Sequence, residues 1–423
     1  MKKILKKIAA ITIFLCLLGL SFYKVDDLLE EKKARQQYKA FYESDTNFDV
    51  IFMGTSHTYH SVFTQELWKE YGISSFNWGY SHCTLAEDYY LLQDIVKFTD
   101  PKLVVIDLYG LMEYENQGNK KYKAGKIEQQ HVQFDSLPLS KSKIQAAYDV
   151  FDDYENNYDF IFNFALYHNR WTELSEEDFN VTYSVAKGSG ILYGHNNANY
   201  IKNKTYTEID INSVCSDYIP KIADFCNKKN IELLFTYLPF PAESMQQNIA
   251  YTLNNYLSQY DCSYVNMLDE NILDTATDIY KDKSHLNYMG AYKTTLWLGK
   301  YIQDKYALND YSDSEEYSSW HEEYEKYVDY KAGRFKFRSK RANLIHNLIL
   351  SYGSDFDVEV KIDTQCKKID SDKLLNRLLF NPDSNISVEN VDGLSYKDKN
   401  YDIVLIIKKS ANGEEVLHTG YTY

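Results

Sequence analysis

The hydroxyl of Ser56 stands where the sequence best suits covalent chemistry. It follows a short apolar run, Asp49–Met53, and Gly54, and it precedes a segment with helical spacing, Thr58–Tyr71. These patterns predict a buried strand, a turn and a helix. A serine at such a junction projects from the end of a sheet beside unpaired N–H groups of the helix, which suits a nucleophile whose attack creates an oxyanion. The alternative is that Thr55 or Ser56 only caps the helix.

A second polar motif, Asp282-Lys-Ser-His285, lies far downstream, just before a predicted helix over Asn287–Tyr306. A serine nucleophile needs a base to accept its proton, and the base needs a carboxylate that sets its tautomer. Because both residues belong to one loop, Asp282 can reach Nδ1 of His285 while Nε2 faces Ser56. The alternative is that the loop only caps the helix that follows.

Apolar runs alternate with amphipathic segments around these motifs. The predicted strands are Asp49–Met53, Ile73–Asn77, Lys102–Leu108, Ile231–Leu238 and Cys262–Met267. The predicted helices are Thr58–Tyr71, Leu85–Phe98, Ser213–Lys229, Ala242–Tyr260 and Asn287–Tyr306. This alternation predicts an α/β fold with a flavodoxin-like, doubly wound parallel sheet. Since sites in such sheets lie at the carboxyl ends of strands, Ser56, Gly79 and the residues after Asp107 are expected to converge.

Three short motifs stand in order along this sheet: Ile51-Phe-Met-Gly-Thr-Ser56-His57, Asn77-Trp-Gly79 and Asp282-Lys-Ser-His285. Together they resemble the sequence blocks of the SGNH (GDSL-like) hydrolases, in particular the membrane-anchored esterases and O-acyltransferases of the cell envelope. The resemblance covers Phe48–Tyr306, without a long insertion. It implies that Ser56 is the nucleophile, His285 the base and Asp282 its orienting carboxylate, with the N–H groups of Ser56 and Gly79 as the oxyanion hole. No metal and no other cofactor are expected.

The third block of the family is incomplete in this sequence. Where the family has Gly-x-Asn, with the Asn donating to the oxyanion, the chain has Asp107-Leu-Tyr109-Gly110. Loss of one oxyanion donor costs on the order of a hundredfold or more in rate. Slow turnover, or transfer in place of hydrolysis, is therefore expected. The alternative is a non-catalytic glycan-binding or assembly protein that retains the SGNH scaffold.

A long insertion, residues 109–208, interrupts the alternation after the third predicted strand. It contains a predicted helix, Lys141–Tyr158, and a glycine-rich part, Ala186–His195. Because it follows the carboxyl end of a strand, we expect a lid or acceptor-binding cap over the site; the alternative is a helix end that docks on the sheet. The candidate substrate-binding side chains, in the insertion and beside the motifs, are His57, His82, His168, Arg170 and Trp171.

The N-terminus carries four lysines, Lys2, Lys3, Lys6 and Lys7, followed by the uncharged run Ile8–Tyr23. Such a run is just long enough to span a bilayer, and the lysines favour a cytoplasmic N-terminus. An uncleaved single-pass anchor in residues 1–23, with the catalytic domain on the extracellular face, is favoured over a cleaved signal peptide. Residues 24–47 are expected to form a solvated helical spacer, and residues 48–308 the SGNH-like domain.

The C-terminal part is predicted to be a linker with some helix, 309–340, and a small α+β domain, 341–423. Strands are expected over Phe356–Ile362 and Tyr401–Lys409, and an Asn-Gly turn before residue 414 predicts a hairpin. This domain carries no recognisable chemistry, but it is a candidate for recruiting a membrane-bound acyl-donor protein.

The composition narrows the classes of partner. The net charge of −15 argues against a nucleic-acid partner. Six cysteines without metal-ligand spacing indicate neither a metal site nor a disulfide framework. The resemblance and the anchor together imply a cell-surface serine esterase or O-acyltransferase. Its expected substrates are acetyl or alanyl esters of an envelope polysaccharide or teichoic acid.

Overall fold

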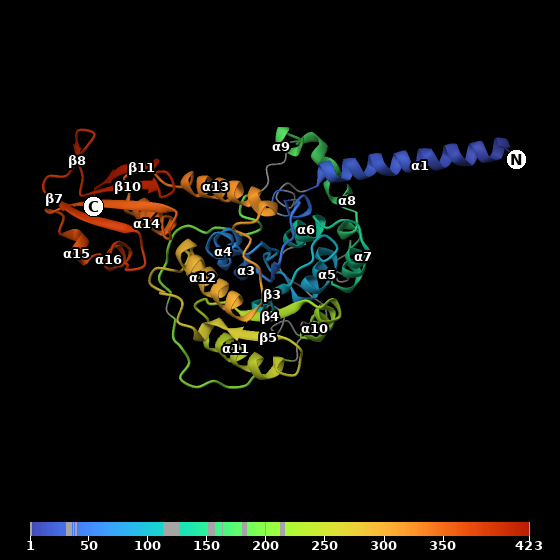
Figure 1. Ribbon diagram of the computed structural model, residues 1–423, viewed down its shortest axis with the longest axis horizontal. Coiled ribbons are helices and arrows are strands. Elements are labelled where there is room, and N and C mark those ends of the chain that lie inside the picture. Colours follow the sequence, from blue (N-terminus) through green and yellow to red (C-terminus); the bar gives the residue numbers. More distant parts are fainter. Residues whose placement is uncertain are drawn as a thin grey trace.

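A five-stranded parallel sheet is the centre of the protein in the computed structural model, which describes residues 2–422 except 31–35, 37, 39, 113–126, 151–156, 163, 180–183, 199 and 212–215. The strands are β1 (Val50–Met53), β2 (Ser75–Asn77), β3 (Leu103–Asp107), β4 (Glu232–Tyr237) and β5 (Ser263–Asn266). Their order in the sheet is β2-β1-β3-β4-β5, and every pairing is parallel (Figure 1). This is the flavodoxin-like order, so the predicted fold class is confirmed.

Helices cover both faces of this sheet, which is why its strands are continuous apolar runs. The helices are α3 (Ser56–Ser61), α4 (Thr64–Tyr71), α5 (Leu85–Ile95), α10 (Tyr218–Lys229), α11 (Ser244–Leu257) and α12 (Tyr288–Lys305). Apolar residues of α4 and α12 pack with one face of the strands, and those of α5, α10 and α11 pack with the other. Short 3-10 turns follow two strands, at Leu108–Met112 and Met267–Asp269.

The single helix expected over Thr58–Tyr71 is divided into α3 and α4. The Asn77 side-chain amide donates to the carbonyl of Val62 at 2.9 Å and to that of Thr58 at 3.1 Å. The backbone N–H of Phe63 donates to the hydroxyl of Thr295 at 2.9 Å. These side chains supply the hydrogen bonds that a continuous helix would have made, and they stabilise the break.

Gly54 makes the turn between β1 and α3 possible. Its φ is +128°, and an added Cβ would lie 2.5 Å from Oγ1 of Thr58 and 3.0 Å from the carbonyl oxygen of Asp107. Only glycine has both the backbone freedom and the space for this position. The turn therefore packs the backbone of Gly54 against the end of β3.

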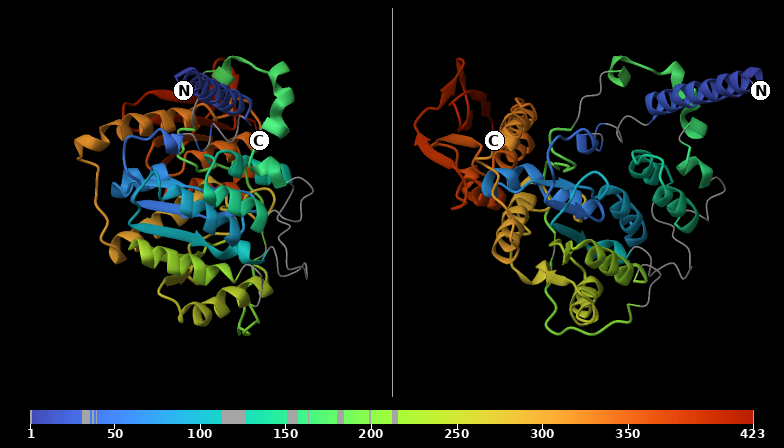
Figure 2. Two further views of the ribbon diagram at one scale, coloured as in Figure 1. Left: turned by 90° about the vertical axis from the view of Figure 1, so that its right-hand side faces the viewer. Right: turned by 45° about the vertical axis from the view of Figure 1, so that its right-hand side comes forward.

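Helix α1 (Lys2–Leu29) projects from the domain (Figures 1 and 2). Its Lys3–Leu29 portion is long and apolar enough to cross a membrane. The segment after it differs from the expected solvated spacer, because Tyr38 and Phe41 are buried. Tyr38 stacks on Trp78 with ring centroids 4.6 Å apart, and Phe41 stacks on Phe48 at 5.2 Å. These aromatic rings cover the sheet near its β2 edge and attach the segment to the domain.

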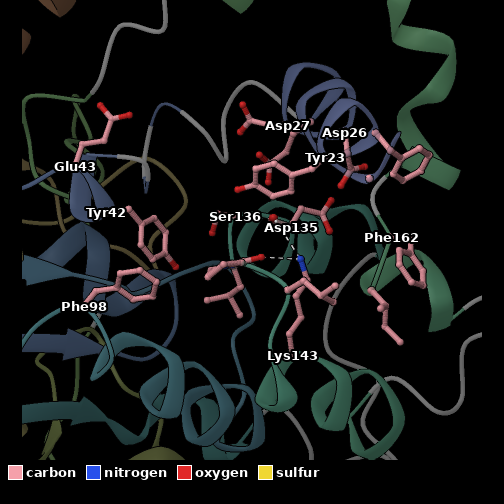
Figure 3. Close-up of a pocket in the computed structure, with 17 residues that line it drawn as sticks. Tyr23, Asp26, Asp27, Tyr42, Glu43, Phe98, Asp135, Ser136, Lys143 and Phe162 are labelled. Atoms are coloured by element: carbon pink, nitrogen blue, oxygen red, sulfur yellow. Dashed lines mark hydrogen bonds between the residues drawn. The ribbon is translucent and has the colours of Figure 1, made fainter. Parts of the chain in front are cut away.

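The insertion is helical where the structure describes it. Its elements are α6 (Ile127–Asp135), α7 (Lys141–Asp149), a 3-10 turn (Asn157–Phe160), α8 (Phe164–Tyr167), a 3-10 turn (His168–Thr172) and α9 (Glu176–Phe179). The predicted helix over 141–158 ends at Asp149, and 151–156 lie outside the described residues. Helix α7 packs on α5, whereas α8 and α9 pack on α1. The Lys143 ammonium is buried beside α1 and donates to the carbonyl of Leu137 at 2.8 Å (Figure 3).

The C-terminal domain is α+β, as predicted. A four-stranded sheet has the order β11-β10-β6-β7, formed by β6 (Phe356–Asp363), β7 (Ile386–Val391), β10 (Ile403–Lys409) and β11 (Glu415–Tyr421). Strands β10 and β11 pair antiparallel across the expected Asn-Gly turn. A small ribbon of β8 (Ser395–Tyr396) and β9 (Lys399–Asn400) and the helices α14 (Arg341–Leu350), α15 (Lys368–Ser371) and α16 (Lys373–Leu379) complete it.

Residues 309–340 contain a short 3-10 turn, Glu315–Tyr317, and a packed helix, α13 (Ser318–Ala332). The side chain of Lys331 on this helix is fully buried. Its ammonium donates to Glu66 of α4 at 2.8 Å and to the Tyr288 hydroxyl of α12 at 2.9 Å, and it pairs with Asp355 ahead of β6. A single apolar cluster also joins α12 to the C-terminal sheet. The two domains therefore share one core.

Replacement of Lys331 by methionine tests this junction. The change would leave the Glu66 carboxylate buried without its cation, whereas Asp355 would keep Lys69 at 2.7 Å. Breaking a buried pair costs about 3–5 kcal/mol, so we expect K331M to lower the free energy of unfolding by that amount. Lys326→Met changes an exposed lysine of the same helix and should cost less than about 0.5 kcal/mol. Urea unfolding of the full chain in detergent measures both, and equal values would contradict the role given to Lys331.

Candidate active site

The hydroxyl of Ser56 is left free for chemistry because its neighbour caps the helix. Thr55 is the N-cap of α3, and its side chain accepts the N–H of His57 at 3.2 Å. Ser56 is the first residue of the helix, and its Oγ lies 2.8 Å from Nε2 of His285. Thr55 therefore caps the helix, and the Ser56 side chain faces the imidazole of His285.

A tight hairpin carries His285 and Asp282. Ile279 and Leu286 form an antiparallel bridge, and the N–H of Tyr280 donates to the carbonyl of His285 at 2.9 Å. Within the hairpin, Asp282 Oδ2 lies 2.8 Å from Nδ1 of His285. The carboxylate accepts this ring N–H, so the proton sits on Nδ1 and the lone pair of Nε2 faces Ser56.

The Asp282 carboxylate is kept charged by its surroundings. Partial burial works against ionisation, but three hydrogen bonds outweigh it and hold the pKa of Asp282 below its ordinary value. Its Oδ1 accepts the backbone N–H of His285 at 3.0 Å and that of Ser284 at 2.9 Å, while Oδ2 accepts the imidazole N–H. These hydrogen bonds therefore hold the Asp282 carboxylate ionised and in place next to the His285 ring.

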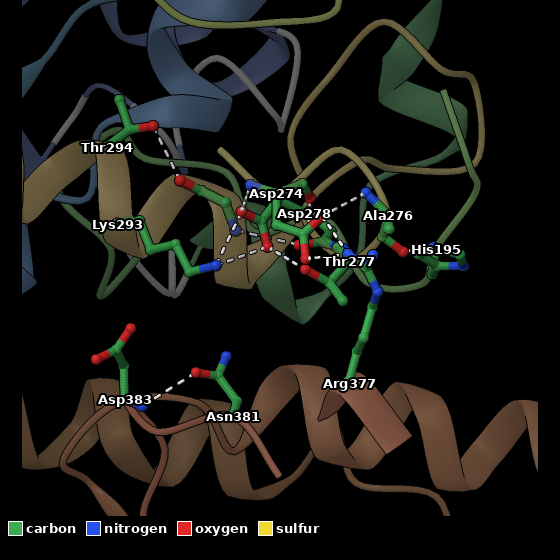
Figure 4. A network of polar contacts seen from close by, with 12 residues as sticks. His195, Asp274, Ala276, Thr277, Asp278, Lys293, Thr294, Arg377, Asn381 and Asp383 are labelled. Carbon is green, nitrogen blue, oxygen red and sulfur yellow. Dashed lines mark hydrogen bonds and ion pairs between the residues drawn. The ribbon is translucent and has the colours of Figure 1, made fainter. Parts of the chain in front are cut away.

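A buried polar network anchors the chain just ahead of this hairpin (Figure 4). The side chain of Asp278 is fully buried, and both of its oxygens accept from the Lys293 ammonium, at 2.9 and 3.0 Å. Burial raises the pKa of Asp278, and the Lys293 charge opposes that rise. Asp274 donates its N–H to Asp278 at 2.8 Å and pairs with Arg377 of α16 at 2.8 Å. The C-terminal domain thus touches the segment that leads into the hairpin.

A cavity of about 250 Å³ lies beside the Ser56 hydroxyl. The residues that line it are Thr55, Ser56, His57, Tyr59, His60, Ser81, His82, Tyr109, Ser284 and His285. The predicted residues His57 and His82 are among them. Sequence reasoning missed Tyr59 and His60, although their spacing of three and four residues from Ser56 places them one helical turn away.

Two of the cavity histidines are neutral because they are buried. His57 stacks on Tyr109 with ring centroids 3.7 Å apart, and burial lowers its pKa well below the usual range. His60 has Nδ1 2.6 Å from the carbonyl of Gly190, and burial lowers its pKa to about 3. Since a carbonyl only accepts, His60 carries its proton on Nδ1. Both rings therefore act as uncharged walls of the cavity.

The expected oxyanion contact of Gly79 is not made in this structure. Its N–H donates to Oδ1 of Asn77 at 2.9 Å, and Gly79 is not among the residues lining the cavity. The Asn77 side chain that holds this N–H is itself fixed by the carbonyls at the end of α3. The Ser56 N–H, which has no intrahelical partner at the first position of α3, remains the backbone donor beside the hydroxyl.

The residues in the third-block position have separate roles. Asp107 is buried, its carboxylate accepts the N–H of Leu238 at 2.9 Å, and burial raises its pKa to about 7. Two residues later, the ring of Tyr109 enters the cavity and packs on His57. The aromatic ring of Tyr109 therefore lies after the end of β3, near the position where the SGNH hydrolases have the asparagine that donates to the oxyanion.

Three predicted substrate-binding residues of the insertion, His168, Arg170 and Trp171, lie outside the cavity beside Ser56. Arg170 donates to the carbonyl of Leu29 at 2.6 Å and also to the carbonyl of Glu30. Its guanidinium forms an ion pair with Asp178 at 2.7 Å. His168 lies in the same 3-10 turn, and Trp171 beside it is 67% exposed. This turn packs on the end of α1, because the guanidinium binds the carbonyls there, and none of the three residues lines the cavity.

The two ends of the insertion, in contrast, do reach the site. Tyr109 lies in the cavity wall at the start of the insertion. Near the other end, the N–H of Gly190 donates to the carbonyl of Tyr59 at 2.7 Å, and its carbonyl accepts from His60. The insertion therefore frames the cavity from its flanks.

Comparison with known proteins adds two solved structures. No family model and no curated protein matches this chain. A GDSL-like lipase from Bacteroides thetaiotaomicron VPI-5482 is similar to it at 12% identity and a TM-score of 0.32, over 65% of this chain and 100% of that one. A family 3 carbohydrate esterase from Clostridium thermocellum is similar at 13% identity and a TM-score of 0.31, over 61% and 96%. The sheet order of this chain agrees with the fold that its sequence motifs predict.

The burial of neutral His60 should make stability depend on pH. Its pKa is about 6.5 in the unfolded chain and about 3 in the folded one, so unfolding takes up a proton below pH 6.5 and the free energy of unfolding falls with pH. At pH 5 this contribution is about 2 kcal/mol. The free energy of unfolding should fall between pH 7.5 and pH 5 by about 2 kcal/mol less in His60→Asn than in the wild type. The asparagine amide can still donate to the carbonyl of Gly190.

Urea unfolding at the two pH values measures this difference. His321→Asn, which changes an exposed histidine, is the matched control and should follow the wild type. An equal decrease in the free energy of unfolding between pH 7.5 and pH 5 in all three proteins would contradict the lowered pKa of His60.

Proposed function

We propose that this protein is an SGNH-type serine esterase or O-acyltransferase. The observation that carries the proposal is the hydrogen-bonded chain from Ser56 Oγ through His285 to Asp282, with both contacts at 2.8 Å. A hydroxyl, an imidazole in the basic tautomer and a fixed carboxylate are the parts that covalent acyl transfer needs. They meet beside a cavity that is open to a reacting group.

The reaction follows from these positions. Ser56 Oγ attacks the ester carbonyl carbon while its proton passes to Nε2 of His285, and Asp282 stabilises the imidazolium that forms. The tetrahedral intermediate collapses, the ester C–O bond breaks, and His285 returns the proton to the leaving alcohol. The acyl group stays on Ser56 until water or a sugar hydroxyl attacks it, with the proton passing through His285 back to Ser56.

The weak oxyanion site favours slow turnover. In this proposal the N–H of Ser56 donates to the oxyanion, but the N–H of Gly79 is engaged by Asn77, and Asp107-Leu-Tyr109-Gly110 lacks the asparagine of the SGNH third block. Each missing donor costs on the order of 10²–10³ in rate. A long-lived acyl-enzyme in a small cavity suits transfer to a hydroxyl that binds there in place of water.

The substrate class follows from the size of the cavity and from α1. A volume of about 250 Å³ lies below the roughly 300–1,000 Å³ of most small-molecule sites, so it suits a short acyl group such as acetyl or alanyl. With α1 as a single-pass anchor and its lysines on the cytoplasmic side, the domain lies on the extracellular face. The acceptors within reach are then envelope polysaccharides or teichoic acids.

Mass spectrometry of the intact protein tests the nucleophile. After incubation with p-nitrophenyl acetate, we expect a single acetyl adduct on Ser56 and its absence in Ser56→Ala, together with at least a 10³-fold loss of esterase rate. Ser81→Ala is the matched control, because Ser81 lines the same cavity but its hydroxyl contacts Tyr59 at 3.4 Å and no imidazole. An adduct that persists in Ser56→Ala would refute the assignment.

The Asp282→Asn variant tests the orienting carboxylate. An amide nitrogen facing Nδ1 of His285 would place the imidazole proton on Nε2, where it opposes deprotonation of Ser56. We expect kcat to fall by about 10³–10⁴ with a small change in KM. Steady-state rates of acetyl-ester hydrolysis measure this. A loss of less than tenfold would mean that Asp282 does not control the tautomer.

A glycan-binding or assembly protein on the same scaffold is the second candidate. The observation that favours it is the engaged N–H of Gly79 together with the absence of the third-block amide. In that case, an isolated envelope glycan would bind equally to the wild type and to Ser56→Ala, and no acyl adduct would form on either protein. Adduct formation on the wild type decides for the enzyme.

A further inference from the structure

A group of exposed apolar side chains gathers where α1 meets the domain, around a second cavity of about 440 Å³ (Figure 3). Its members are Phe22 and Tyr23 of α1, Phe98 after α5, Leu139 ahead of α7 and Phe162 ahead of α8, and each is 45–59% exposed. They come from separate segments of the chain but line one cavity, and we call them the apolar rim. None of them lines the cavity beside Ser56. Single exposed apolar residues are ordinary, whereas a contiguous group marks an interaction surface.

The position of the apolar rim along α1 sets its depth in a membrane. The uncharged run of α1 is Ile8–Tyr23, and the first charged residue after it is Lys24. A helix rises about 1.5 Å per residue, so this run spans about 24 Å, somewhat less than the roughly 30 Å of the hydrocarbon layer. When α1 crosses a bilayer, Tyr23 therefore lies at the outer interface, and Gly19 lies about 6 Å further in. The whole apolar rim lines the same cavity as Gly19, so it lies at the depth of that interface.

Two contacts hold this part of the domain against α1. Helix α8 packs on α1, and the ring centroids of Phe22 and Phe164 are 4.9 Å apart (Figure 1). Further along the helix, Arg170 donates to the carbonyl of Leu29. These contacts keep the apolar rim at the level that α1 sets.

Exposed lysines lie next to the apolar rim. Lys24 directly follows Tyr23 on α1, and Lys141 follows Leu139 by two residues. Apolar and aromatic side chains beside lysines are typical of a surface at the bilayer interface, because the apolar groups enter the lipid while the ammonium reaches the phosphates. The short uncharged run of α1 also favours flanking side chains that reach the interface. Together with the continuity of the apolar rim and α1, this arrangement selects a bilayer over a soluble protein as the partner.

We propose that the apolar rim inserts into the outer interface of the bilayer that α1 crosses. Phe98, Leu139 and Phe162 enter among the outermost segments of the acyl chains, and the two lysines donate to lipid phosphates. The domain is then attached to the membrane through three of its own segments as well as through its helix. This inference rests on the membrane anchor of the proposed function and is independent of acyl transfer at Ser56.

Photocrosslinking in the full chain tests this surface. Leu139 or Phe162 is replaced, one at a time, by p-benzoylphenylalanine, and the protein is placed in nanodiscs of phosphatidylcholine. After irradiation, intact mass spectrometry measures the fraction of protein that carries one attached phospholipid. Leu15, which is exposed in the uncharged run of α1, is the positive control.

Ile201 is the matched negative control, because it is an exposed apolar residue whose carbonyl accepts from Gln247 of α11. Helix α11 lies at the opposite end of the domain from α1 (Figures 1 and 2). We expect the lipid yields at positions 139 and 162 to be within threefold of that at position 15 and at least tenfold above that at position 201.

Lys141→Glu tests the contact of the lysine with phosphate. In nanodiscs that contain phosphatidylglycerol, this variant should lower the lipid yield at position 139 at least threefold, because the lipid phosphates repel a carboxylate. Lys204→Glu makes the same charge change at an exposed lysine near Ile201 and should leave the yield unchanged. Equal yields in the two variants would overturn the contact assigned to Lys141.

Three other results decide against the surface as a whole. Crosslinking at position 15, with yields at 139 and 162 no higher than at 201, would overturn the proposal and leave the anchor in place. No crosslink at any position would refute the anchor and this surface together. In native membranes, capture of a protein and no lipid at 139 and 162 would overturn the proposal in favour of a protein partner.

Acetylation of Ser56 by p-nitrophenyl acetate in the same samples reports separately on the enzyme. Lipid crosslinks without the acetyl adduct would refute the acyl transfer and support this surface. The adduct without lipid crosslinks at 139 and 162 would refute this surface and support the acyl transfer.

Discussion

The contact between Asp282 and Nδ1 of His285 is the one on which the proposed chemistry depends. It determines which ring nitrogen carries the proton, and so whether the nitrogen that faces Ser56 can accept one. The carboxylate has this effect only because it stays ionised, and two backbone N–H groups of the same hairpin keep it so. A loop of four residues thus contains the proposed base, His285, together with the carboxylate that sets its tautomer.

The position of that hairpin is set by elements far from it. The buried pair of Asp278 and Lys293 fixes the chain on its N-terminal side, and Arg377 reaches the same segment from the C-terminal domain. Lys331 and a common apolar cluster join this domain to the helices beside the sheet. The C-terminal domain has no reactive group of its own, but it belongs to the structural support of the site.

Much of this arrangement could be read from the sequence, because it depends on local pattern. Strands buried on both faces are continuous apolar runs, and Ser56, Asp282 and His285 follow predicted element ends, so the sheet and its central contact were predictable. The contacts that were missed depend on side chains reaching across the fold. Nothing near Gly79 indicates that the amide of Asn77 takes its N–H. Likewise, Arg170 suits an anion by type, but it binds the carbonyls at the end of α1.

The attachment of the N-terminal segment has a consequence for how substrates are met. Arg170 holds the carbonyl of Leu29 at the end of α1, and Tyr38 and Phe41 are packed into the domain shortly after it. These contacts hold the domain close to the end of α1, so it cannot move far from that helix. With α1 in a bilayer, the Ser56 hydroxyl is carried at a constant height and moves only sideways, by lateral diffusion. Under the proposed function, a polymeric acceptor would therefore have to reach down to that layer, and its outermost segments would stay beyond reach of Ser56.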